Sequence, residues 1–241
     1  MVSLGTSGVL LAPTREVHTA ESGGLASFDH AVPGSTCMLG CVLNAGGALR
    51  WFRDTLCSEE IADAKRGERD VYDVLMDNAA SVIAGSENLY FMPYLTGERT
   101  PHNNPYARGV WFGLTPRHNR NHMVRAIIEG ITYGLRDCLE LVRENGIDVT
   151  EIRVTGGGAR SRFWLQTIAD VFGLPVRAIP EVNGGAMGAA ILAGIGTGIY
   201  DDFEDAAARL IKTGRVLKPA SRRSEHYQDC YKRFRELYEG M

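Results

Sequence analysis

The chain has 241 residues, of which 44% are hydrophobic and 23% are charged, and its formal net charge is −3. These values are those of an ordinary globular protein with one large domain or two small ones. No basic stripe is present, so nucleic acid is not an expected partner. Apolar runs such as residues 9–12 are far too short to span a bilayer, so no membrane partner is expected.

The cysteines and the first residues indicate a cytoplasmic protein. The start, Met1 to Leu4, lacks the basic and long apolar regions of a signal peptide. Five cysteines occur at irregular spacing. Cys37 and Cys41 resemble half of a metal site, but no second Cys or His pair follows at zinc-site spacing. On a strand, residues four apart share a face, so buried thiols in a reducing compartment are expected.

Strand and helix patterns alternate along the chain, which predicts an α/β fold. Near the N-terminus, two short strands flank Gly5-Thr6-Ser7-Gly8, which predicts a hairpin with a polar tip. The elements predicted up to the middle of the chain are strands over residues 2–4, 9–12 and 38–43, a helix over 45–56, two helical pieces over 59–84 that break near Gly67, a strand over 88–95, a long polar loop over 96–108 and a strand over 110–114.

The strongest helix pattern follows that strand. Eight of its residues fall at three- and four-residue steps on one face: Val124, Ile127, Ile128, Ile131, Leu135, Cys138, Leu139 and Val142. Asn119 or Asn121 can cap its start, and Gly146 lies just past its end. Downstream, strands are predicted over residues 151–154 and 176–179, each followed by a helix. The second of these helices starts at residues 184–190, which are so poor in bulk that another backbone is expected to pass close by.

The most informative stretch is Thr155-Gly156-Gly157-Gly158-Ala159-Arg160-Ser161, between a predicted strand and a predicted helix. Glycines let the backbone approach a base or a phosphate without a Cβ in the way. A helix start also offers unpaired N–H groups and a positive dipole end to an anion. The stretch contains neither of the two common phosphate-loop motifs. Taken alone, it is compatible with nucleotide contact or with a tight structural connection.

Several motifs together resemble the FGGY family of carbohydrate kinases. The longest is Gly109-Val110-Trp111-Phe112-Gly113-Leu114, followed after seven residues by His122-Met123-Val124-Arg125-Ala126-Ile127-Ile128-Glu129, and it matches that family's signature. Three glycine turns accompany it: Gly5-Thr6-Ser7-Gly8, Ala45-Gly46-Gly47 and Gly156-Gly157-Gly158-Ala159. The segment over residues 94–105 is similar to the xylulokinase branch. The resemblance runs over essentially the whole chain, and it is thinnest over residues 58–84 and after residue 200.

The resemblance implies an actin-like (ribonuclease H-like) ATPase fold, with residues 1–241 forming a single C-terminal, ATP-binding domain of a sugar kinase. In this family, an upstream domain of similar size carries most of the sugar site and the first phosphate hairpin. The catalytic Asp lies in a Gly-Asp turn before the strand that leads to Gly-Thr-Ser-Gly. Because that strand begins at Met1, we expect the upstream sugar-binding domain and the catalytic Asp to be absent from this chain.

The resemblance also implies an ATP site. Thr6 at the hairpin tip is expected to hydrogen-bond the terminal phosphates, with Ser7 beside it. Gly46 and Arg50 lie one helical turn apart and share a face, and Arg50 is expected to reach phosphate or ribose or to stack on the base. The remaining expected contacts come from the glycine turn: Gly157, Gly158, Ala159 and Ser161. The structural alternatives are an ordinary polar hairpin tip and an arginine on a solvated face.

The polar loop over residues 96–108 suggests either a metal or acid–base site or a structural connection. Its polar residues are Glu98, Arg99, His102, Asn103 and Asn104. We expect the structural role and assign no metal site. His122 and Glu129 are expected to be cap and packing partners rather than catalysts.

These inferences lead to three alternative functions. The first is the ATP-binding half of a kinase that transfers the ATP γ-phosphate, with Mg²⁺, to a ketose, D-xylulose being the expected sugar. The second is a stand-alone nucleotide-binding or regulatory module without kinase activity. The third is an FGGY kinase for another substrate, such as glycerol, ribulose or gluconate. In the first case the chain alone is expected to be inactive, because the group that orients and deprotonates the hydroxyl is absent.

A half that normally packs against another domain is expected to expose an apolar face and to self-associate. The strand over residues 2–4 has no strand before it in the chain, so we expect it to form an open sheet edge available for pairing. An amphipathic helix follows Pro219, and it can pack either on its own domain or on a neighbour. Its apolar residues are Tyr227, Tyr231, Phe234, Leu237 and Tyr238.

Overall fold

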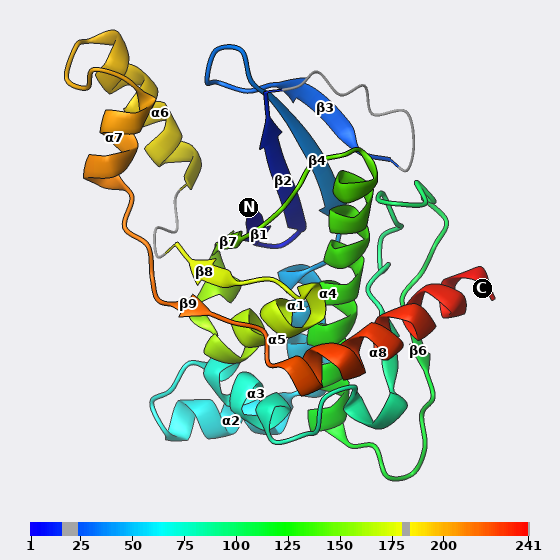
Figure 1. Cartoon of the computed structure of the whole chain (residues 1–241). Coiled ribbons are helices and arrows are strands. Elements are labelled where there is room, and N and C mark those ends of the chain that lie inside the picture. Colours follow the sequence, from blue (N-terminus) through cyan, green and yellow to red (C-terminus); the bar gives the residue numbers. More distant parts are fainter. Residues whose placement is uncertain (16–23, 180–183, 241) are drawn as a thin grey trace.

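A seven-stranded mixed sheet lies at the centre of the structure, with strand order β3-β4-β2-β1-β7-β8-β9 (Figure 1). The computed structural model describes residues 1–15, 24–179 and 184–240. The strands of the sheet are β1 (Val2–Leu4), β2 (Gly8–Thr14), β3 (Ala26–Asp29), β4 (Thr36–Val42), β7 (Ile152–Thr155), β8 (Val176–Ala178) and β9 (Val216–Leu217). A separate hairpin pairs β5 (Tyr90–Met92) with β6 (Val110–Phe112).

Helices cover the sheet and extend beyond it (Figure 1). They are α1 (Gly46–Leu56), α2 (Ser58–Arg66), α3 (Val71–Ala80), α4 (Arg120–Glu144), α5 (Arg162–Phe172), α6 (Gly184–Gly196), α7 (Phe203–Leu210) and α8 (Ser221–Glu239), with short 3₁₀ turns η1 (Ser86–Asn88) and η2 (Gly157–Arg160). The sequence predicted most of these elements, but it missed α7 and the two short edge strands β3 and β9.

Strand β1 lies inside the sheet, so the expectation of an open edge there is wrong. Val2 pairs with Leu10 of antiparallel β2 on one side and with Val154 of parallel β7 on the other. The side that we expected to be open is filled by a strand from much later in the chain. Because β1 and β7 run in the same direction, both end at one edge of the sheet, where the hairpin tip and the glycine turn follow.

Helix α4 is the centre of the hydrophobic core. The eight residues of its predicted apolar face are all buried. Asn119, rather than Asn121, caps its start: the Asn119 side chain accepts hydrogen bonds from the Asn121 and His122 backbone N–H groups, and His122 completes a capping box. Gly146 has a φ of 81° just beyond the end of the helix. The periodic apolar pattern of this segment was strong because one face of α4 packs against both the sheet and the surrounding helices.

A buried polar cluster joins α4 to two other segments. Glu129 accepts hydrogen bonds from the Gly85 backbone N–H (3.0 Å), the Ser86 hydroxyl (2.8 Å), Arg125 Nε (2.7 Å) and the Tyr227 hydroxyl (2.7 Å). Both carboxylate oxygens of Glu129 therefore accept hydrogen bonds from within the protein. This arrangement agrees with the expected packing role of Glu129, as the capping box does for His122.

Helix α8 packs on its own domain, which decides between the two alternatives for it. Tyr227, Tyr231 and Phe234 are buried against the core. The Tyr231 hydroxyl donates to Oδ1 of Asp137 on α4 over 2.7 Å. Burial raises the pKa of Asp137 from 3.8 to about 7, although the bond from Tyr231 acts in the opposite direction.

The polar loop over residues 96–108 has a structural role. Glu98 is buried and accepts a hydrogen bond from the His102 backbone N–H over 2.8 Å, and burial raises the pKa of its carboxyl group. The His102 ring stacks on Tyr238 of α8 at 3.5 Å between centroids. Thr100 accepts a hydrogen bond from the Cys41 backbone N–H over 3.2 Å. The loop thus ties β4 to α8.

The prediction that Cys37 and Cys41 are buried thiols is confirmed. Cys37 and Cys41 are buried, as are the other three cysteines, and all five thiols are free. Within residues 1–15, 24–179 and 184–240, no group of three or more His, Cys, Asp or Glu side chains could hold a metal ion. In the same part of the chain, no helix is both long and apolar enough to cross a membrane.

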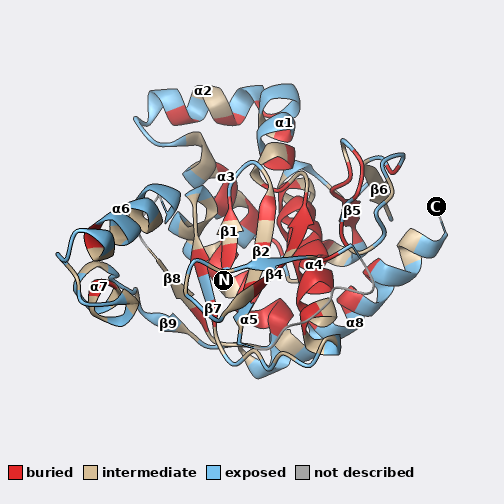
Figure 2. Cartoon of the chain, turned by 90° about the horizontal axis from the view of Figure 1, so that it is seen from above, coloured by how far each residue is buried: buried red, intermediate tan, exposed pale blue. Residues whose placement is uncertain are grey.

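Helices α6 and α7 stand away from the main body and are largely exposed (Figure 2). The expectation that another backbone passes close to the glycines of α6 is wrong for the part of the chain that the structure describes, where a Cβ added at Gly184, Gly185 or Gly188 would meet no atom within 4 Å. The helix instead packs mainly against α7. The apolar surface of α6 includes Leu192, which is 48% exposed. Ile199, which follows the end of α6, is 64% exposed.

Candidate functional site

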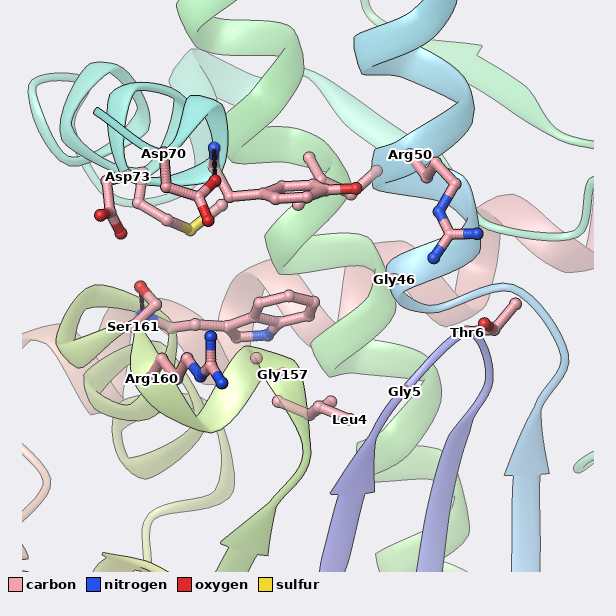
Figure 3. A pocket seen from close by; sticks show the side chains of 15 residues that line it. Leu4, Gly5, Thr6, Gly46, Arg50, Asp70, Asp73, Gly157, Arg160 and Ser161 are labelled. Carbon is pink, nitrogen blue, oxygen red and sulfur yellow. Dashed lines mark hydrogen bonds between the residues drawn. The ribbon is translucent and has the colours of Figure 1, made fainter. Parts of the chain in front are cut away.

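A cavity of about 480 Å³ opens at the edge of the sheet where β1 and β7 end (Figure 3). Four parts of the chain line it: the tip of the β1–β2 hairpin, the start of α1, the start of α3, and the glycine turn with the first turn of α5. Six of the eight residues proposed from the sequence to bind nucleotide line this cavity: Thr6, Gly46, Arg50, Gly157, Gly158 and Ser161. Ser7 and Ala159 do not.

The glycines at the start of α1 let the hairpin tip approach its backbone. The Gly46 N–H donates to the Gly5 carbonyl and the Gly47 N–H to the Thr6 carbonyl, each over 2.9 Å. A Cβ at Gly46 would lie only 2.6 Å from the Gly5 oxygen, so a side chain there would displace the hairpin. These N–H groups are therefore bonded within the protein, and they fix the position of Thr6 instead of facing a ligand.

Ser7 is held away from the cavity. Its hydroxyl donates to the Leu43 backbone carbonyl over 2.9 Å, which links the hairpin to the end of β4. Thr6, at the tip itself, is exposed and lines the cavity. Of the two neighbouring hydroxyl residues, the structure thus leaves Thr6 available to a ligand.

The three positions of the turn differ in whether the fold requires a glycine there. Gly156 has a φ of 90°, and a Cβ there would lie 2.5 Å from the Leu4 carbonyl oxygen. A Cβ at Gly158 would lie 2.8 Å from Leu4 Cδ1. Gly157 does not have a left-handed φ, and among the described residues no atom lies within 4 Å of an added Cβ. Two of these glycines therefore allow the turn to cross β1, and only Gly157 faces open space in the cavity (Figure 3).

The last residues of the turn begin helix α5. The Ala159 N–H donates to the Gly156 carbonyl over 3.1 Å, and the Ala159 side chain packs against the core. Ser161 is the N-cap of α5, because its hydroxyl oxygen accepts a hydrogen bond from the Trp164 N–H over 3.2 Å. The hydroxyl proton of Ser161 is still available as a donor.

The charged side chains of the cavity are separated. Arg50 and Thr6 lie at one end, and Asp70, Asp73 and Ser161 lie toward the other (Figure 3). Asp70 caps α3 by accepting a hydrogen bond from the Tyr72 N–H over 2.8 Å. This wall of the cavity was not predicted from the sequence, and neither were the lining residues Leu4, Leu49, Arg160 and Trp164. No local motif marked α3, which is placed at the site by its packing against α4 and α5.

Comparison with known proteins identifies the family of the chain. The family model described as "FGGY family of carbohydrate kinases, C-terminal domain" matches residues 1–197. The chain belongs to the FGGY family of carbohydrate kinases. A xylulose kinase from Staphylococcus epidermidis is 35% identical over 99% of this chain and 46% of its own length. A gluconokinase from Bacillus subtilis is 38% identical over 94% of this chain and 44% of its own length.

The solved structures agree with this assignment and with the fold expected from the motifs. The crystal structure of xylulose kinase from Rhodospirillum rubrum superposes with a TM-score of 0.87 at 30% identity, over 99% of this chain and 46% of that one. The chain therefore has the actin-like ATPase fold of the FGGY kinases and corresponds to their C-terminal half. It spans about half the length of the curated relatives that it matches.

Proposed function

We propose that this FGGY chain is the ATP-binding half of a carbohydrate kinase that transfers the ATP γ-phosphate to a ketose, with D-xylulose as the sugar. The observation that carries the proposal is the cavity at the ends of β1 and β7. It brings together the hairpin tip at Thr6, the α1 residue Arg50 and the open glycine Gly157, which are far apart in the sequence.

The cavity suits a nucleotide in size and in the character of its walls. Its volume of about 480 Å³ lies within the roughly 300–1,000 Å³ typical of small-molecule sites. Thr6 and Arg50 provide a hydroxyl and a guanidinium for phosphate oxygens. Gly157 leaves the space that a flat base or a ribose requires. In this proposal ATP enters with its phosphates toward Thr6 and its base toward Ser161.

ATP supplies the phosphoryl group, and Mg²⁺ neutralises charge on its phosphates. Magnesium commonly binds one or two protein carboxylates together with substrate phosphates. We therefore propose that the nucleotide itself carries the Mg²⁺ to this site. The carboxylates Asp70 and Asp73 lie toward the end of the cavity away from Thr6 (Figure 3), so neither is assigned as the base for the sugar hydroxyl. In the proposed kinase that base comes from outside residues 1–241.

Two compounds are candidates for the phosphoryl acceptor. Xylulose is favoured by the S. epidermidis relative and by the loop over residues 94–105. Gluconate is the second candidate, because the B. subtilis gluconokinase has the higher identity, 38% against 35%. Both comparisons cover only the half that holds the cavity, whereas we expect most of the sugar site to lie in the other half. The proposed location is the cytoplasm.

Two measurements on the 241-residue chain test the proposal. Calorimetric titration with ADP and Mg²⁺ is expected to show binding. A coupled assay for ADP release is expected to show no turnover with D-xylulose or with gluconate, because in this proposal the base and the domain that closes over the site lie outside residues 1–241. Absence of ADP binding would contradict the nucleotide site. Robust sugar-dependent turnover would contradict the assignment of the base to another part of the kinase.

A further inference from the structure

The start of α3 provides a carboxylate at the end of the cavity opposite Thr6. Asp70 and Asp73 both line this end (Figure 3), but their roles differ. Asp70 is the helix cap and its Oδ1 accepts the Tyr72 N–H over 2.8 Å. Asp73 lies one turn further along, and among the described residues no hydrogen bond or ion pair engages its side chain. Asp73 is therefore the acid that is free to meet a ligand.

The direction of the nucleotide decides which group would meet Asp73. With the phosphates at Thr6, the ribose lies near Gly157, and the base reaches the space between Asp73 of α3 and Ser161 of α5. Figure 3 shows these two side chains on facing walls of the cavity. This step depends on the proposed nucleotide site, and it adds a residue that contacts the edge of the base.

We propose that Asp73 sets the base preference of this site by accepting a hydrogen bond from the amino group at position 6 of adenine. An ionised carboxylate is an acceptor only, so it pairs with an amino group and repels the oxygen of a 6-oxopurine. Ser161 keeps a hydroxyl proton, and Arg160 from the same wall carries donors that suit the ring nitrogens. Asp73 is a specificity-determining residue in this scheme and takes no part in phosphoryl transfer.

The size of the preference follows from the position of Asp73. Its side chain is exposed, so water competes for the carboxylate in the free protein. We expect ADP to bind about three- to tenfold more tightly than inosine diphosphate, the scale of one hydrogen bond in water. In Asp73→Asn, the side-chain amide can donate to the 6-oxo group, so the ratio of the two affinities should fall to about one.

Asp77→Asn is the matched control. Asp77 lies on the same helix and is also exposed, but it pairs with Arg69 over 2.6 Å and does not line the cavity. The experiment is calorimetric titration of the 241-residue chain and both variants with ADP, inosine diphosphate and GDP. A helix-stabilising role of Asp73 would change the unfolding temperature without changing the ratio of nucleotide affinities, so the ratio is the decisive measurement.

Each outcome has one meaning. A preference for ADP in the wild type and in Asp77→Asn, lost in Asp73→Asn, supports the proposal. Equal affinities in the wild type, or a preference that survives in Asp73→Asn, overturns it and leaves the nucleotide site in place. Tighter binding of GDP than of ADP by the wild type also overturns it, since the carboxylate would then engage the guanine N1–H and 2-amino group. If no nucleotide binds, the proposed function fails as well.

Discussion

Gly157→Val tests whether the open glycine of the turn contacts the nucleotide. An added Cβ at Gly157 meets no atom of the described residues within 4 Å, and Gly157 does not have a left-handed φ. The folded protein should therefore accept valine with little change in unfolding temperature. In the complex, the two methyl groups would occupy space proposed for the base or ribose. At the overpacking scale of about 1–3 kcal/mol, ADP affinity should fall about 5- to 150-fold.

The assay combines calorimetric titration with ADP and a thermal unfolding curve for each variant. Gly188→Val is the matched control, because an added Cβ there also meets no described atom within 4 Å, but Gly188 lies on α6, outside the cavity. Gly158→Val should instead lower stability, since its Cβ would lie 2.8 Å from Leu4 Cδ1. If Gly157→Val is folded and binds ADP as tightly as the wild type, the turn is only a structural connection and the site assignment is refuted.

Three further predictions concern phosphate binding, pH and association. Thr6→Ala should weaken ATP binding by about 1.5–3 kcal/mol, the scale of a hydrogen bond to a charged group, and leave adenosine binding unchanged; an equal loss for both ligands in calorimetry would contradict a phosphate contact. The raised pKa of Asp137, about 7 against 3.8, means that the folded state holds its proton more tightly than the unfolded chain, so the free energy of unfolding should decrease as pH rises from about 4 to about 7. Asp137→Asn should flatten that slope in urea titrations, and an unchanged slope would show that burial of this carboxyl group is not its cause. We expect the chain to self-associate through α6, where Leu192 is exposed; Leu192→Glu should shift the species seen in light scattering toward the monomer, whereas a wild type that is monomeric at high concentration would contradict this.

The sequence predicted those parts of the fold that depend on interactions between residues close together in the chain. The apolar face of α4, the cap at Asn119 and the hairpin at Thr6 each follow from spacing or from turn chemistry within a few residues. The neighbour of β1 does not, because β7 is distant in sequence and nothing local marks the pairing of Val2 with Val154. Strand β9 has only two residues, Val216–Leu217, too few to show alternation.

In the candidate site, too, residues that belong to local motifs were predicted, and residues that depend on tertiary packing were not. Gly46 and Gly157 were found because both belong to glycine turns that are visible as motifs, although only Gly46 has a steric reason in the fold to be glycine. Asp73 was not found, because an acid in the first turn of a helix is ordinary and acquires meaning only where α3 packs beside the glycine turn. Ser7 was assigned with Thr6 from the same motif, yet its hydroxyl bonds the Leu43 carbonyl. The motif alone does not tell which of the two neighbouring hydroxyl residues lines the cavity and which is bonded within the fold.

The α6–α7 pair is inserted between two strands that are partners of each other. Strand β8 precedes it and β9 follows it, with Val176 opposite Leu217. The Gly214 N–H donates to the Ala178 carbonyl over 2.9 Å at the base of the insertion. Opening of α6 and α7 would therefore leave the ladder between β8 and β9 intact. This unit can therefore exchange its amide hydrogens without a cost to the sheet beside the proposed nucleotide cavity.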